Sequence, residues 1–315
     1  MDLLYGSVEE RRSKMGKKKK QMLLLLAVFA LLLVLLFIMK MMNQKQADKL
    51  AQEKEAARIF VTDMEHISKI SYQLDDEQMV FEQKDGVWTY VPDTDFPLDS
   101  YYPELIADAF GNMEAVRELE EVDDAADYGM DQPAYTVELM DDELGEETLY
   151  FGDASGEDYY LMVKSTGKIY TVSSDMLKYF DYKLEDMADL DDYPSIGSGN
   201  LLKEEIICNG ESTIYDSENE DDAENIAAVA GGLGAVTLNE VADYSVEEAD
   251  LVGYGLDQET RITVNVTYSD DGEEKEMTLY IGRENGEDSR HVMLNDSKIV
   301  YLVGAEICSN ILNEE

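Results

Sequence analysis

YGMDQ at residues 128–132 and YGLDQ at residues 254–258 are two copies of one short motif, and the rest of the chain is organised around them. Each copy is followed by an alternating stretch, an acidic loop, and then TLYFG at 148–152 or TLYIG at 278–282. GED, another alternating stretch, Lys-Ile and a helix-like segment follow in both halves. A self-match that keeps its order over about 50 residues predicts two homologous modules.

The local patterns around these motifs predict mostly strands, with a few helices. From Ile67 the apolar period is two, and MVFEQ and VWTYV flank the turn at Asp85 and Gly86. Residues 97–112 read as a helix that begins at Asp99 or Ser100, and 107–116 weakly resembles 229–238. We therefore expect an α+β fold in which each module is an antiparallel sheet with helices, the second lacking the Trp88 strand.

Composition places the boundaries of the modules. DDYPSIGSGN has the turn-rich composition of a connection, so we expect a first module at 67–190, a linker at 191–202 and a second module at 203–315. Residues 43–66 contain no Gly or Pro and are rich in helix formers. They predict a helical stalk ahead of the first module.

An apolar run precedes this stalk. Residues 22–39 carry no charged side chain, which predicts a transmembrane helix over 21–42 behind a basic tip at 1–20. The tip holds seven Lys or Arg, so the positive-inside rule leaves the N-terminus in the cytoplasm and the bulk of the chain outside the cell membrane. A cleaved signal peptide is the alternative, but the run is long and NQKQADK offers no small-residue cleavage site.

Charge limits the partners of the chain. Beyond residue 42 there are 17 Lys or Arg against 67 Asp or Glu, a net charge of −50, which excludes a nucleic-acid partner. The basic tip favours contact with anionic lipid. Cys208 and Cys308 could form one disulfide or lie apart as two small buried side chains.

The repeated turn is the strongest candidate site because it occurs twice. The candidate residues are Tyr128, Gly129 and Asp131 with their counterparts Tyr254, Gly255 and Asp257. The glycines can adopt positive φ and the aspartates can bond nearby backbone N–H groups, which favours a structural turn. A catalytic carboxylate pair would require the two aspartates to converge with separated pKa values.

No other motif carries catalytic or metal chemistry. The acidic loops (141–147, 218–222 and 270–274) invite a calcium hypothesis, but their spacing does not fit an EF-hand and favours solvated hairpin tips. His66 and His291 have no partner at metal-ligand spacing. We therefore expect no catalytic residue, no metal and no cofactor.

Aromatic side chains offer one further candidate. Trp88, Tyr90, Tyr101 and Tyr102 could line a ligand groove, although packing between a strand and a helix explains them as well.

Several of these features together resemble a bacterial family. They are the basic tip, the anchor, a G-x-W strand (Gly86 and Trp88), the YG turn from Tyr128 to Pro133, an L-x-[IF]-G strand (Leu149 to Gly152) and an [IV]-Y-x-V strand (Ile169 to Val172). The family is known as domain of unknown function 4340. The second copy departs from it, with Glu259-Thr260 in place of the proline and no Trp strand.

The resemblance implies a membrane-anchored extracytoplasmic protein that accompanies ABC-2-type export permeases or gliding-motility-type auxiliary proteins, with no catalytic residues to carry over. Our first hypothesis is a non-enzymatic accessory or scaffold protein with a multi-spanning permease as partner. The second is an extracytoplasmic ligand- or cell-wall-binding module with a cleft between the two repeats. A hydrolase with an unrecognised acidic site is the third and weakest.

Overall fold

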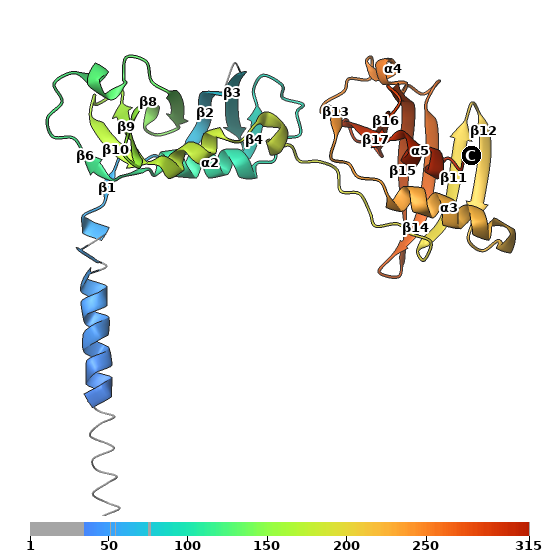
Figure 1. Ribbon diagram of the computed structural model, residues 1–315, viewed down its shortest axis with the longest axis horizontal. Helices are drawn as coiled ribbons and strands as arrows, with labels where there is room; N and C mark the ends of the chain where they lie inside the picture. Colours follow the sequence, from blue (N-terminus) through green and yellow to red (C-terminus); the bar gives the residue numbers. More distant parts are fainter. Residues whose placement is uncertain (1–34, 51, 54, 75–76, 315) are drawn as a thin grey trace, which may run out of the picture. The chain divides into compact units, whose positions relative to one another are not determined.

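The computed structural model describes residues 35–50, 52, 53, 55–74 and 77–314 (Figure 1). They belong to two compact units, Met1–Phe60 and Val61–Glu315. In the first unit, residues 35–50 are helical, the helix continues at 52, 53, 55 and 56, and β1 (Ile59–Phe60) follows.

The predicted membrane anchor lies for the most part outside the described residues. The basic tip at 1–20 and residues 21–34 are not described, whereas 35–42 are helical. The apolar side chains of this short stretch are all exposed, at 46 % to 68 % of their surface. Within the described part of the chain, no helix is both long and apolar enough to cross a membrane.

The helix predicted for 43–66 ends at residue 56. The following segment is extended instead, because it is tied to the end of α2 (Tyr101–Gly111). The buried Thr62 hydroxyl donates to the Phe110 carbonyl at 2.6 Å and accepts from the Met113 N–H at 3.0 Å. The Met64 N–H donates to the Gly111 carbonyl at 2.8 Å. These tertiary contacts outweigh the local helical propensity.

The first module is an eight-stranded antiparallel sheet with the order β4-β3-β2-β7-β8-β9-β10-β6. Its strands are β2 (Ile67–Leu74), β3 (Glu77–Lys84), β4 (Val87–Tyr90), β6 (Arg117–Glu118), β7 (Tyr135–Asp141), β8 (Gly145–Ser155), β9 (Asp158–Val163) and β10 (Ile169–Ser173). The shorter elements are β5 (Glu114–Ala115), η1 (Ala125–Tyr128), η2 (Ser174–Phe180) and η3 (Leu184–Met187).

The core of this module lies between the sheet and α2. Ile106 and Phe110 of α2 are fully buried, and the Phe110 ring lies 6.0 Å from the ring of Phe151 and 5.7 Å from that of Phe180. The opposite face of the strands carries Lys69 and Glu138, which are exposed. The predicted alternation of apolar and polar faces is therefore confirmed.

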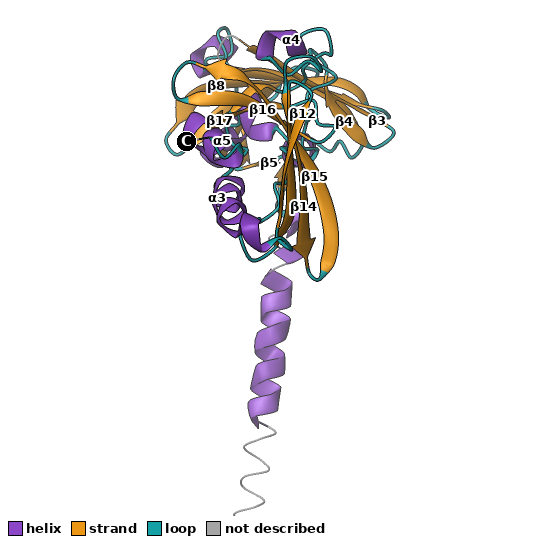
Figure 2. Ribbon diagram, turned by 90° about the vertical axis from the view of Figure 1, so that its right-hand side faces the viewer, coloured by secondary structure: helices purple, strands orange, loops and turns teal. Residues whose placement is uncertain are grey.

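The second module is a seven-stranded sheet with the order β12-β11-β14-β15-β16-β17-β13. Its strands are β11 (Leu201–Cys208), β12 (Glu211–Asp216), β13 (Val241–Asp243), β14 (Ile262–Asp270), β15 (Glu273–Asn285), β16 (Ser289–Leu294) and β17 (Val300–Gly304). The helices are η4 (Glu220–Asp222), α3 (Ala223–Gly234), α4 (Leu251–Tyr254) and α5 (Ala305–Ile311), and α3 and α5 lie together against one face of the strands (Figure 2). Cys208 and Cys308 are free thiols.

The two sheets have the same strand order, element for element. β11 corresponds to β2, β12 to β3, and β13 to β6, while β14 to β17 correspond to β7 to β10. Among the described strands of the first sheet, only β4 lacks a counterpart, as predicted for the Trp88 strand. The antiparallel α+β class is confirmed.

The repeated motifs meet in the same way in both modules. Gly129 and Gly255 have φ of +79° and +66° and end a helical turn. A Cβ on Gly152 would lie 2.0 Å from the Tyr128 carbonyl oxygen, and a Cβ on Gly282 would lie 2.3 Å from that of Tyr254. We call this close approach the glycine interlock.

Each interlock coincides with an irregularity in its sheet. The β8–β9 register shifts between Phe151 and Ala154, and the β15–β16 register shifts between Ile281 and Glu284. Such a bulge bends the strand locally. The turn carrying the YG motif therefore packs directly on a bulge that only a glycine accommodates.

We expect Gly152→Ala to lower the free energy of unfolding by about 2–4 kcal/mol, since the methyl group would overlap a backbone carbonyl that cannot move freely. Urea denaturation followed by tryptophan fluorescence would measure the effect, because Trp88 lies in the same module.

Gly231→Ala is the matched control. Gly231 lies in α3, and a methyl group added there would meet nothing within 4 Å beyond the backbone of its own helix. This change should therefore stabilise the protein by about 0.5–1 kcal/mol. Because Gly231 lies in the second module and Trp88 in the first, far-UV circular dichroism is followed for both variants. Equal, small effects of the two substitutions would contradict the interlock.

Candidate functional site

The two aspartates of the repeated turns lie in different surroundings, and Asp257 is the one whose carboxylate holds its turn. Asp257 is half-buried, and its carboxylate accepts from the Glu259 N–H at 3.1 Å and from the Thr260 hydroxyl. These bonds, the Thr260 hydroxyl first, hold the pKa of Asp257 below its usual value. Asp131 is exposed in the turn ahead of β7. A lowered pKa is the opposite of what the acid partner in a carboxylate pair requires.

The tyrosines of the same turns pack locally. The Tyr128 ring lies 4.9 Å from the Tyr160 ring. The Tyr254 hydroxyl donates to Asp243 at 2.8 Å, and its ring lies 5.1 Å from His291. His291 is buried, with Nδ1 3.1 Å from the Arg283 carbonyl oxygen, which is a structural environment.

The four aromatic candidates occupy two different environments. Trp88 and Tyr90 are buried on β4, where the Tyr90 ring lies 5.8 Å from Phe81 and 6.0 Å from Phe96. Tyr101 is 60 % exposed at the start of α2. It contacts the ring of Tyr102, which in turn contacts Tyr182. The first pair is buried, and the second lies in a row of three tyrosines in which Tyr101 is exposed and Tyr102 and Tyr182 are half-buried.

The acidic loops are not all solvated tips. Asp141 is buried, and its carboxylate accepts from the N–H groups of Leu144 at 2.9 Å, His66 at 2.8 Å and Glu143 at 2.8 Å. Burial opposes its ionisation, but the three backbone bonds prevail and lower the pKa of Asp141. In the described part of the chain, no group of three or more His, Cys, Asp or Glu side chains is arranged to hold a metal ion.

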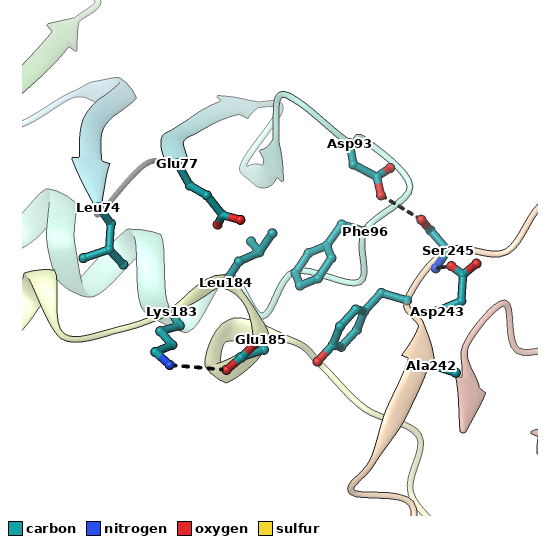
Figure 3. Close-up of a pocket in the computed structure, with 11 residues that line it drawn as sticks. Leu74, Glu77, Asp93, Phe96, Lys183, Leu184, Glu185, Ala242, Asp243 and Ser245 are labelled. Atoms are coloured by element: carbon teal, nitrogen blue, oxygen red, sulfur yellow. Dashed lines mark hydrogen bonds and ion pairs between the residues drawn. The ribbon is translucent and has the colours of Figure 1, made fainter. Parts of the chain in front are cut away.

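A cavity of about 680 Å³ lies where the second sheet meets the first module (Figure 3). In the first module, its walls come from the end of β2, the start of β3, the loop after β4, and η3 with the residue before it. In the second module, they come from β13 and the two residues that follow it. They are Leu74, Glu77, Asp93, Phe96, Lys183, Leu184, Glu185, Ala242, Asp243, Tyr244 and Ser245. We call this cavity the intermodule cleft.

Two contacts close one side of the intermodule cleft. The Phe96 and Tyr244 rings lie 5.1 Å apart, which extends the aromatic row from Phe81 through Tyr90. The Ser245 hydroxyl donates to Asp93 at 2.7 Å. Outside the cleft, Lys298 lies 3.5 Å from Asp95 as an exposed ion pair, which contributes little.

The electrostatics of the intermodule cleft are negative. Four carboxylates line it, and the single lysine, Lys183, lies 3.8 Å from Glu185. Burial, together with the charges of Glu185 and Asp186, raises the pKa of Tyr244. Such a cleft favours cationic groups, and the two aromatic rings offer faces on which a cation could stack.

The predicted linker is held along the second module. The Asp191 carboxylate accepts from the Tyr301 hydroxyl at 2.8 Å and from the Ser297 hydroxyl at 2.6 Å. Two residues earlier, the Asp189 N–H donates to the Pro97 carbonyl in the first module at 2.7 Å. The connection therefore passes from one module to the other within a very short stretch.

A buried carboxyl lies on β11. Glu204 is fully buried and neither of its carboxyl oxygens has a hydrogen-bond partner among the described residues; the buried Tyr193 hydroxyl also lacks one there. By strand register Glu204 occupies the position of Ile70, which pairs with Leu139 as Glu204 pairs with Val266. Burial raises the pKa of Glu204 to about 8.

The fold and the intermodule cleft define an acidic α+β protein with two modules of one topology. The family model described as "Domain of unknown function (DUF4340)" matches residues 88–192 and 216–314, one range in each module. The chain belongs to this family. No curated protein and no solved structure shows significant similarity to the chain.

The sequence does not predict the residues of the intermodule cleft. They come from segments far apart in the chain, with no shared spacing, so no sequence pattern marks them. The only sequence feature that relates to these residues is that 242–245 lie shortly before the second YG motif.

Glu204 generates a prediction about pH. The folded chain keeps this proton up to about pH 8, whereas the unfolded chain releases it near 4.5, so stability falls as the pH rises between these values. The loss is complete above pH 8 and is of the order of 5 kcal/mol. We expect Glu204→Ile to remove most of this slope and to raise the urea midpoint at pH 9.

Glu205→Gln is the control, because Glu205 lies on the outer face of the same strand with hydrogen bonds to Ser212 and Asn265. It should leave the slope between pH 5 and pH 9 in place. Identical slopes in the wild type and Glu204→Ile would show that Glu204 is not the group responsible.

Proposed function

We propose that this chain is a non-enzymatic accessory protein, anchored in the cell membrane with its two modules on the outer side, and that it works by contact with a multi-spanning export permease. The observation that carries this proposal is the stretch at residues 35–42, the start of a helix, where every side chain except Lys40 is apolar and exposed. Insertion into lipid would remove these apolar side chains from water, which is favourable.

The charge of the chain supports the same arrangement. The basic tip and the acidic remainder differ in sign, as expected when one end faces anionic lipid and the other faces the exterior. A tether also raises the effective concentration of a membrane partner, so weak contacts of the two modules suffice. An ABC-2-type export permease is the partner that the family resemblance suggests.

A second candidate function is ligand binding, and the intermodule cleft is the observation that favours it. Its volume of about 680 Å³ suits a small molecule or a peptide side chain. Its carboxylates and the Phe96–Tyr244 pair favour a cationic ligand with an apolar portion.

We expect the full-length protein to co-purify with a multi-spanning permease from detergent-solubilised membranes. A chain that begins at Val61 should lose that association by about a hundredfold, because the tether no longer supplies effective concentration. Quantitative mass spectrometry of the purified material would measure the ratio.

The matched control is the full-length chain with Asp131→Ala and Asp257→Ala. These changes should lower the urea midpoint, chiefly through the bonds of Asp257 to Glu259 and Thr260, and leave the association intact. Retention of the permease by the chain that begins at Val61 would contradict the tethering role. Tight binding of spermidine, abolished by Asp243→Asn with no permease retained, would favour the second candidate instead.

A further inference from the structure

The free edges of the two sheets are protected unequally. Unpaired backbone groups at an edge invite another strand, and proteins normally shorten, bend or interrupt such edges. In the first sheet, β4 has four residues and is followed closely by Pro92, and β6 has two residues. In the second sheet, β13 has three residues and an irregular register with β17.

β12 has none of these protections. It is six residues long, its register with β11 is regular from end to end, and its sequence ESTIYD contains no Pro, Gly or Lys. Residues 211–214 are all exposed, and Ile214 exposes 48 % of its surface. Its counterpart β3 has its outer edge covered by β4, where the Val91 N–H donates to the Val80 carbonyl at 2.9 Å.

The antiparallel pairing of β12 with β11 determines which backbone N–H and C=O groups of β12 point away from the sheet. The Asp216 N–H points away from β11, since it donates to the Asp222 carboxylate at 3.2 Å. Because directions alternate along a strand, the N–H and C=O groups of Ser212 and Ile214 also point outward. No hydrogen bond to these outward groups of Ser212 and Ile214 is present among the described residues.

The surroundings of β12 define the charge of an occupant. Acidic residues lie at both ends of the strand and in the turn that follows it: Glu211, Asp216, Glu218, Glu220, Asp221 and Asp222. A second copy of the chain would place another such set against this one, which is unfavourable. A basic segment would complement it.

We propose that β12 is a docking edge for an extended, basic segment of a partner protein, which adds as a strand beside Ser212 and Ile214. The backbone bonds supply affinity, and Lys or Arg side chains at the ends of the segment meet the acidic residues. Docking at β12 does not depend on the membrane tether, so an experiment can disprove this proposal without disproving the proposed function.

The test uses the full-length protein in detergent and a fluorescent peptide, Lys-Val-Thr-Val-Thr-Val-Lys, followed by anisotropy. Ile214→Pro removes one outward N–H that the chain itself does not use, and proline is tolerated at such edge positions. Ile214→Thr, which keeps the N–H, is the matched control. We expect the peptide to bind about tenfold more weakly to Ile214→Pro and within about twofold of wild type to Ile214→Thr.

Two further measurements keep the proposal testable if Ile214→Pro folds poorly. In the wild type, the peptide should slow hydrogen exchange at Ser212 and Ile214, and a peptide with Glu in place of both Lys should bind about tenfold more weakly. Equal binding of the Lys and Glu peptides, unchanged exchange, or full binding by a folded Ile214→Pro would overturn the proposal. So would self-association in sedimentation that Ile214→Pro abolishes, since the edge would then belong to a second copy.

Discussion

The close approach of the Tyr128 carbonyl to Gly152, repeated by Tyr254 and Gly282, is the constraint on which each sheet depends. It requires a residue without a Cβ on the long strand and, at the turn, a second glycine with positive φ. These two glycines let the turn pack against the bulge, so that the strand after the turn, β7 or β14, begins in the correct register. This explains why the motifs recur as a pair, and it leaves little reason to assign them chemistry.

The contacts between the two modules are much fewer than the contacts within each module. In the part of the chain that the structure describes, an aromatic contact, a hydrogen bond to Asp93 and an exposed ion pair accompany the short connection between Asp189 and Asp191. The intermodule cleft lies beside these contacts, so its acidic walls belong to both modules. A partner that binds there would bridge the two modules, whereas a strand added to β12 would engage the second module alone.

Much of the fold could be predicted from the sequence, because local patterns carry it. The turn at Asp85 and Gly86 has positive φ at both residues, as a two-residue hairpin requires. The weak resemblance between 107–116 and 229–238 aligns residues 122 positions apart, which is one residue off. The structurally equivalent glycines, Gly111 and Gly234, are 123 residues apart, and each ends a helix against a backbone carbonyl. The end of the stalk helix, the burial of Glu204 and the cleft depend on tertiary contacts, which no local pattern records.

Hydrogen exchange on single-glycine variants tests the dependence on the glycine interlock most directly. We predict that Gly152→Ala accelerates exchange in β7 to β10 and leaves β14 to β17 protected, and that Gly282→Ala does the reverse. Each sheet would then be shown to rely on its own glycine. Unchanged protection in the substituted module, or equal loss in both modules, would contradict this account.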